Sequence, residues 1–131
     1  MKTDNWTIYT DGGSRGNPGP SACAFVILNV HQQGFYLGVG TNNNAEYMGV
    51  LHAYQYLSTL DYKPQIIHFY LDSELVVKQL NGLYKIKDIN LQKVSAHIKA
   101  FQKNFIVTYT HISRSQNVAA DLLVNQTLDN H

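Results

Sequence analysis

The spacing of apolar and polar positions divides the chain into short segments, and the first of these are typical of strands. Apolar and β-branched runs at residues 6–10, 22–30 and 35–39 predict three strands. Residues 11–20 contain glycines and prolines that continue neither a strand nor a helix, so they predict a long loop. The polar tetrad at 31–34 suits a hairpin turn. The start of the chain is therefore predicted to be an antiparallel three-stranded meander.

The apolar period then lengthens to that of a helix. From Tyr47 to Leu57, apolar residues recur at spacings of three and four, and the asparagines at 42–44 offer an N-cap, which predicts a helix of about four turns. Residues 66–71 form a nearly unbroken apolar run, typical of a central strand that is covered on both faces. The following pair Asp72-Ser73 can cap a second helix that ends at Asn81-Gly82.

The remaining chain adds two helices and one strand. Asn90 can cap a third helix, residues 106–112 predict a fifth strand, and Asn117 can cap a last helix that runs to Leu128. The element order βββαβααβα predicts an α/β fold, with a five-stranded mixed sheet flanked by helices. A chain of 131 residues that is 44% apolar can bury one sizeable core. Because no linker or repeat interrupts the pattern, residues 1–131 are predicted to form a single domain.

Composition excludes several classes of protein. The single cysteine, Cys23, cannot build a disulfide framework, and no Cys or His cluster has the spacing of a zinc site. The N-terminal residues lack the apolar run of a signal peptide, and no run of apolar residues approaches the roughly 20 that cross a bilayer. We therefore expect a soluble, cytoplasmic protein without a membrane partner, and we infer no obligate protein partner.

Four acids occur where predicted strands end or predicted helices begin. Asp11 closes the first predicted strand and Asp72 the fourth, Glu46 lies in the first turn of the first predicted helix, and Asp121 lies in the second turn of the last. Ligand sites in open α/β sheets gather at the carboxyl ends of strands, so folding can bring these acids together. Taken singly, each acid has an ordinary explanation as a turn residue, a cap or a helix-start acid.

The segments around these acids jointly resemble the four signature segments of type 1 ribonuclease H, over about the whole chain from Trp6 to Leu128. The segments are Tyr9-Thr-Asp-Gly-Gly-Ser-Arg-Gly-Asn-Pro-Gly-Pro20, Thr41-Asn-Asn-Asn-Ala-Glu46, Tyr70-Leu-Asp-Ser73 and Asn117-Val-Ala-Ala-Asp121. The resemblance implies the ribonuclease H-like fold, with which the predicted element order agrees. It also implies that the catalytic residues and metal ligands are Asp11, Glu46, Asp72 and Asp121, with Asp11 as the bridging ligand.

A group of four neighbouring carboxylates needs cations. The like charges repel one another, and two divalent ions would neutralise them. Oxygen ligands favour Mg²⁺, or alternatively Mn²⁺, over zinc. By resemblance, we expect a metal-dependent endonuclease that hydrolyses the RNA strand of RNA–DNA hybrids, with two metal ions flanking the scissile phosphodiester.

The charge distribution also favours a nucleic-acid partner. Ten bases and nine acids give a net charge of +1, and without the four proposed ligands the rest of the molecule carries +5. Six lysines lie within residues 78–103 with a single acid, Asp88, and we expect Lys85 and Lys87 of this segment to contact the hybrid. The alternative is a solvated helix face with apolar anchors. Members of the resembled family often carry a basic protrusion here, but residues 82–89 are short, so we expect weaker duplex binding.

The resemblance suggests further contacts to the hybrid. Asn17, Asn42 and Asn43 match positions that touch the hybrid, and Thr41 matches one that holds a phosphate of the DNA strand. Their ordinary explanation is as turn and cap residues. We expect Arg114 to contact a phosphate. His111 is either an auxiliary residue for proton transfer or product release, or a partly buried structural histidine.

Three departures from the family pattern leave other functions open. The loop before Asp121 is short, the basic protrusion is missing, and Glu74 stands where bacterial members often have glutamine. Glu74 either adds negative charge near the site or serves only as a helix-start acid. The alternative function is a ribonuclease H-like protein that binds nucleic acid with weak or no cleavage. An integrase or 3′ exonuclease of the same architecture is disfavoured, because those proteins show other acid patterns.

Overall fold

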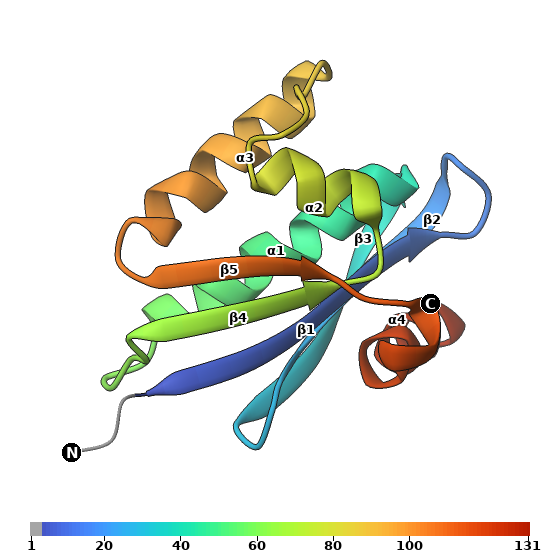
Figure 1. The fold of residues 1–131 in the computed structure, drawn as a ribbon. Coiled ribbons are helices and arrows are strands. Elements are labelled where there is room, and N and C mark those ends of the chain that lie inside the picture. The colour runs from blue at the N-terminus through green and yellow to red at the C-terminus, as the bar shows by residue number, and fades with distance from the viewer. Residues whose placement is uncertain (1–3) are drawn as a thin grey trace.

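A mixed sheet of five strands organises the structure (Figure 1). The structure is a computed structural model that describes residues 4–131. The strands are β1 (Asn5–Ser14), β2 (Gly19–Ile27), β3 (His31–Gly40), β4 (Ile66–Leu71) and β5 (Ile106–His111). They lie in the order β3-β2-β1-β4-β5; the first three form an antiparallel meander, and β4 and β5 extend the sheet parallel to β1. The predicted five-stranded mixed sheet is confirmed.

Helices cover both faces of this sheet. They are α1 (Asn42–Ser58), α2 (Glu74–Leu80), α3 (Ile89–Gln102) and α4 (Val118–Asp129), and a 3₁₀ turn, η1 (Arg114–Gln116), precedes the last. Figure 1 shows α1, α2 and α3 on one face, while α4 lies on the other face against β1, β2 and β3. Between residues 4 and 131, no helix combines the length and apolar character that crossing a membrane requires.

Two hydrophobic clusters of unequal size hold the helices on the sheet. The main core lies under α1, α2 and α3, and its largest buried side chains include Tyr47, Tyr54, Phe25 and Phe69. The smaller cluster lies under α4 and consists of Ala22, Ala24, Val124 and Leu128. Because successive side chains of a strand point to opposite faces, β2 presents Phe25 to the main core and its alanines to α4. These small side chains leave room for α4 to lie close to the sheet.

The turns between the first strands differ from the prediction. The long loop predicted at 11–20 was wrong in extent, because β1 continues to Ser14 and pairs with β2 as far as Ser21. Gly12 therefore lies inside a strand, where an added Cβ would lie 2.2 Å from backbone atoms of Ala45 in α1. The turn between β2 and β3 falls at residues 28–30 instead of 31–34, and Asn29 adopts a positive φ of 64° there.

The helix caps follow the prediction only in part. Ser73 caps α2 as expected by accepting a hydrogen bond from the Val76 amide (3.3 Å). Thr41, and not the asparagines after it, caps α1, since its hydroxyl accepts from the Asn44 amide (3.1 Å). Asp88, not Asn90, caps α3. Asn117 occupies the N-cap position of α4, but its side chain makes no capping bond.

Candidate functional site

Asp11 and Glu46 lie together because β1 and α1 pack backbone against backbone. An added Cβ at Gly12 would clash with Ala45 in α1, and one at Gly49 would lie 2.9 Å from the Asp11 carbonyl oxygen. The two glycines thus allow a contact that larger residues would prevent. Both acids are nearly buried, with 6% of Asp11 and 8% of Glu46 exposed. The sequence predicted Glu46 in the first turn of this helix. The prediction was wrong, because α1 begins at Asn42 and Glu46 lies beyond its first turn.

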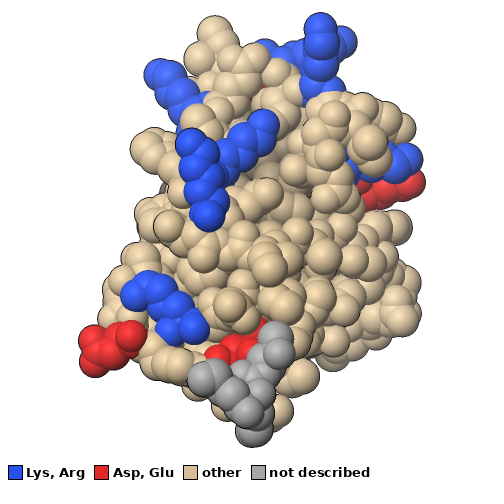
Figure 2. Space-filling view, turned by 60° about the vertical axis from the view of Figure 1, so that its left-hand side comes forward, with Lys and Arg blue, Asp and Glu red and all other residues tan. Residues whose placement is uncertain are grey.

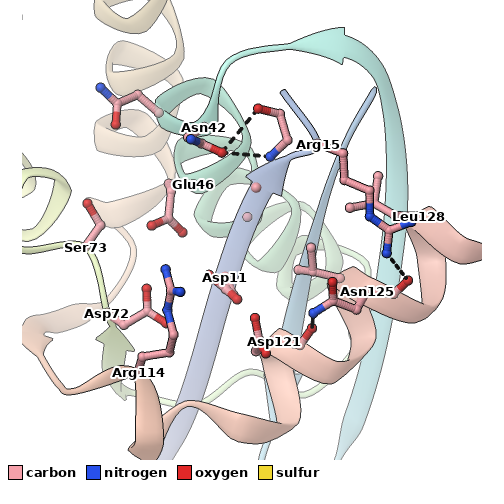
Figure 3. Close-up of a pocket in the computed structure, with 15 residues that line it drawn as sticks. Asp11, Arg15, Asn42, Glu46, Asp72, Ser73, Arg114, Asp121, Asn125 and Leu128 are labelled. Atoms are coloured by element: carbon pink, nitrogen blue, oxygen red, sulfur yellow. Dashed lines mark hydrogen bonds between the residues drawn. The ribbon is translucent and has the colours of Figure 1, made fainter. Parts of the chain in front are cut away.

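Asp72 completes a group of three acids. It directly follows β4, which runs parallel to β1 and pairs with it, so the chain leaves β4 at the same edge of the sheet. One carboxylate oxygen from each of Asp11, Glu46 and Asp72 lies within 4.8 Å of the others. Figure 3 shows these carboxylates converging from three separate elements.

Asp121 faces the same cleft from the opposite side but lies outside this three-acid group. It projects from the first turn of α4, not the second as predicted. In Figure 3 its carboxylate points toward Asp11, which lies between it and the other two acids. Folding therefore brings all four acids to one cleft, with three closely grouped and one apart.

Burial and mutual repulsion make the charged forms of the two innermost acids unfavourable. Burial, with the nearby Asp72 charge, raises the pKa of Asp11 to about 7, although a backbone hydrogen bond from Gly12 opposes the shift. Burial and the Asp11 charge likewise raise the pKa of Glu46 well above its ordinary value. One oxygen of Glu46, Oε1, is buried without a hydrogen-bond partner among residues 4–131. Buried, repelling oxygen ligands fit a site for a divalent metal ion.

The cleft around the acids has a volume of about 580 Å³. Besides the four acids, its polar lining includes Ser14, Arg15, Asn42, Asn43, Ser73, Arg114 and Asn125. Asn42 connects the start of α1 to β1 and to the loop after it. Its side-chain Oδ1 accepts a hydrogen bond from the backbone N–H of Ser14 (2.8 Å), and its backbone N–H donates to Asn17 Oδ1 (3.0 Å). Of the predicted hybrid contacts, Asn42, Asn43 and Arg114 therefore line the cleft, and Asn17 is bonded to its rim.

The other predicted contacts lie outside the cleft. Thr41 lines a separate hollow of about 320 Å³ together with Asn44, Asp88 and Asn90. Lys85 lines a hollow of about 380 Å³ between α2 and α3, and Lys87 is exposed in the connecting loop. Figure 2 shows basic side chains gathered over the upper part of one face, at the height where Figure 1 places α2 and α3.

Two residues singled out from the sequence are explained by their surroundings. His111 ends β5 and is exposed, so the alternative of a partly buried histidine was wrong; it is not among the residues that line the cleft. Glu74 lies in the first turn of α2 and forms an ion pair with Lys78 (3.0 Å). Its side chain is 61% exposed, which fits the explanation as a helix-start acid.

Four polar residues that line the cleft were not predicted from the sequence: Ser14, Arg15, Ser73 and Asn125. Arg15 and Ser73 lie inside the motifs but have ordinary roles in loops and caps, so nothing in their spacing set them apart. Arg15 forms an ion pair with Asp129 (2.6 Å), which links the β1–β2 loop to α4. Asn125 follows Asp121 by one helical turn and donates to its carbonyl oxygen (3.1 Å). Only this helical spacing could have identified Asn125.

The sheet order and the acidic cleft define a ribonuclease H-like protein, and comparisons agree. The solved structure of LC11-RNase H1 in complex with RNA/DNA hybrid matches with a TM-score of 0.90 and 35% identity, over 95% of this chain and 97% of that chain. A family model described as "Reverse transcriptase-like" matches residues 9–127.

Curated relatives narrow the class to one family. Ribonuclease HI of Halobacterium salinarum is 35% identical over 127 residues, and bifunctional protein Rv2228c of Mycobacterium tuberculosis is 33% identical over 129 residues. The matches cover 92% and 93% of this chain but 63% and 35% of those relatives, so the chain spans only part of their length. The chain belongs to the type 1 ribonuclease H family.

Proposed function

We propose that this protein is a metal-dependent endonuclease that hydrolyses the RNA strand of RNA–DNA hybrids. The observation that carries the proposal is the group of Asp11, Glu46 and Asp72, whose oxygens lie within 4.8 Å of one another at an open cleft. The LC11 relative, at 35% identity, was solved in complex with RNA/DNA hybrid, which supports the choice of substrate.

Asp11, Glu46, Asp72 and Asp121 are the proposed catalytic residues and metal ligands, and Mg²⁺ is the proposed cofactor, with Mn²⁺ as an alternative. Two such ions, when bound, would activate the attacking water and stabilise the leaving oxygen. Asp11 is the proposed shared ligand, because it lies between Asp121 and the other two acids (Figure 3). Burial of Asp11 and Glu46 removes competing water, so their charges act strongly on whatever cation enters.

The polar lining is proposed to orient the hybrid. Asn42 uses Oδ1 to accept from Ser14, which leaves its NH₂ group as a donor to the 2′-hydroxyls of the RNA strand, and Asn17 and Asn43 are proposed to act beside it. The Thr41 hydroxyl accepts from the Asn44 amide, so its own hydrogen can be donated to a phosphate of the DNA strand.

Basic residues are proposed to hold the backbone of the hybrid. Arg114 lines the cleft beside the acids and is proposed to contact a phosphate, which its planar guanidinium can bind with two hydrogen bonds. Lys85 and Lys87, between α2 and α3, are proposed to contact phosphates farther from the acids. His111, exposed at the end of β5, is proposed only as an auxiliary residue, because it is not part of the cleft lining.

A cleavage assay tests the proposal. Labelled RNA–DNA hybrid, with RNA and DNA duplexes as controls, is incubated with the protein and Mg²⁺, then Mn²⁺. The variants are Asp11→Asn, Asp72→Asn and the matched control Asp61→Asn, which alters an exposed acid outside the cleft. We expect the wild type and Asp61→Asn to cleave the hybrid but neither the RNA duplex nor the DNA duplex. We expect Asp11→Asn and Asp72→Asn to cleave the hybrid at least about 100-fold more slowly.

Equal rates for the wild type and Asp11→Asn would refute the enzymatic function. The second candidate is a hybrid-binding protein with weak or no cleavage, which the short segment between α2 and α3 favours. Tight hybrid binding without cleavage in either metal would support that candidate instead.

A further inference from the structure

Asn117, which precedes α4, is hydrogen-bonded to Asp72, to Asp121 and to Thr10, the residue before Asp11. Its side chain is buried, with 1% of the residue exposed. Nδ2 donates one hydrogen bond to the carbonyl oxygen of Thr10 in β1 (2.9 Å) and another to Oδ2 of Asp72 (3.1 Å). The Asn117 carbonyl oxygen accepts from the Asp121 amide (3.1 Å). One residue therefore joins the neighbour of Asp11, the Asp72 carboxylate and the helical turn that carries Asp121.

The two partners fix the orientation of the Asn117 amide. Thr10 O and Asp72 Oδ2 are both acceptors, so only the NH₂ end of the amide can face them. Oδ1 of Asn117 is consequently left buried without a partner among residues 4–131, which costs stability. The side chain makes no capping bond to α4 either. Helix capping therefore does not explain the orientation of this side chain, whereas its bonds to Thr10 and to Asp72 do.

We propose that Asn117 is a positioning residue that holds the Asp72 carboxylate in the three-acid group. The inference rests on the proposed function, in which Asp72 binds a divalent ion. Asp72 needs such support more than its neighbours do, because it follows the end of β4 and is less buried than Asp11 and Glu46. Hydrogen-bond partners of metal ligands fix ligand orientation, and their removal typically lowers metal affinity or activity about 10- to 100-fold.

The chain supplies a matched control for this interaction. Asn81, at the C-terminal end of α2, donates through Nδ2 to the carbonyl oxygen of Tyr109 in β5 (3.1 Å). Like Asn117, it links a helix end to a strand carbonyl, but it is not among the cleft residues. Removing Asn81 therefore tests the loss of a helix–strand hydrogen bond without loss of the bond to Asp72.

The test compares Mn²⁺ binding to the wild type, Asn117→Leu and Asn81→Leu. Leu has nearly the shape of Asn but lacks its hydrogen-bonding groups. Binding to the metal-free full chain is measured by calorimetry, and hybrid cleavage is followed in parallel. We expect Asn117→Leu to raise the Mn²⁺ dissociation constant about 10- to 100-fold and to lower kcat with little change in KM for the hybrid. We expect Asn81→Leu to bind Mn²⁺ as the wild type does.

Different results overturn different statements. If the wild type does not bind Mn²⁺, the proposed metal site itself is wrong. If the wild type binds and Asn117→Leu binds equally well, or if Asn81→Leu loses as much affinity, Asn117 has no positioning role. Should Leu prevent folding, as judged by circular dichroism, Asn117→Ser replaces it with the same expectations, because Ser suits an N-cap position but is too short to reach both partners.

Discussion

Replacing Asp11 by Asn should stabilise the metal-free protein at alkaline pH, although it should abolish cleavage. Burial and the Asp72 charge raise the pKa of Asp11 from 3.8 to about 7. The folded protein therefore holds this proton more tightly than the unfolded chain. The contribution of Asp11 to the free energy of unfolding is fully present below about pH 4 and is lost as the pH rises toward about 7.

The size of the effect follows from the pKa shift. A shift of about three units corresponds to about 4 kcal/mol at pH 8 and to less than about 1 kcal/mol at pH 4. Asn carries no charge at either pH, so Asp11→Asn should gain up to that amount at pH 8 and almost nothing at pH 4. The backbone hydrogen bond from Gly12, which favours the charged carboxylate, reduces the gain.

Urea unfolding followed by circular dichroism, in EDTA and from pH 4 to pH 8, measures this difference. Asp61→Asn is the control, because it removes the charge of an exposed acid that lies outside the cleft. A gain for Asp11→Asn that is equal at pH 4 and pH 8, or a loss of stability at pH 8, would refute the reasoning that burial and repulsion raise the pKa of Asp11.

Three further predictions concern packing, metal and substrate. Gly12→Ala adds a methyl group where the Ala45 backbone lies 2.2 Å away, so thermal unfolding should show a loss of about 1–3 kcal/mol or more; wild-type stability would contradict the close approach. Mg²⁺ at 100 times its dissociation constant should stabilise the wild type by about 2.7 kcal/mol in calorimetry but should stabilise Asp72→Asn less, and equal shifts would argue against the metal site. Replacing Lys85 and Lys87 by Ala should weaken hybrid binding and flatten its salt dependence, measured by fluorescence anisotropy, and an unchanged slope would exclude phosphate contacts.

The element order could be predicted from the sequence because most elements bury a regular set of positions, and that burial repeats in the spacing of apolar residues. The extent of β1 could not be predicted from the sequence. Gly12 lies within a strand because it pairs with Cys23 of β2, and α1 packs closely against it; neither contact leaves a local signal in the sequence. The predicted N-caps of α1 and α3 were wrong for a different reason. Thr41 stands beside three asparagines that could also accept a hydrogen bond, and Asp88 stands near Asn90, so the backbone conformation decides between them.

The candidate site, too, could be predicted only in part. The sequence and its family resemblance were enough to propose the four acids, but not their arrangement. Asp11, Glu46 and Asp72 group together because of the backbone contact between β1 and α1 and the parallel pairing of β1 with β4. Asp121 lies apart because it belongs to α4, whose position depends on small side chains of β2. The contacts of Asn117 were hidden because an asparagine before a helix resembles an ordinary cap.

α4, which forms one wall of the cleft, packs on its own small cluster and not on the main core. Asp11, Glu46 and Asp72 are carried by elements of the main core, whereas Asp121 is carried by a helix that packs on Ala22 and Ala24. Enlarging either alanine would lift α4 from the sheet and widen the gap between Asp121 and the other acids, leaving the opposite face of the sheet untouched. Two methyl groups on the far side of the sheet from the main core therefore help to set the span across the cleft, together with the bonds by which Asn117 and Arg15 tie α4 to β1 and to the β1–β2 loop.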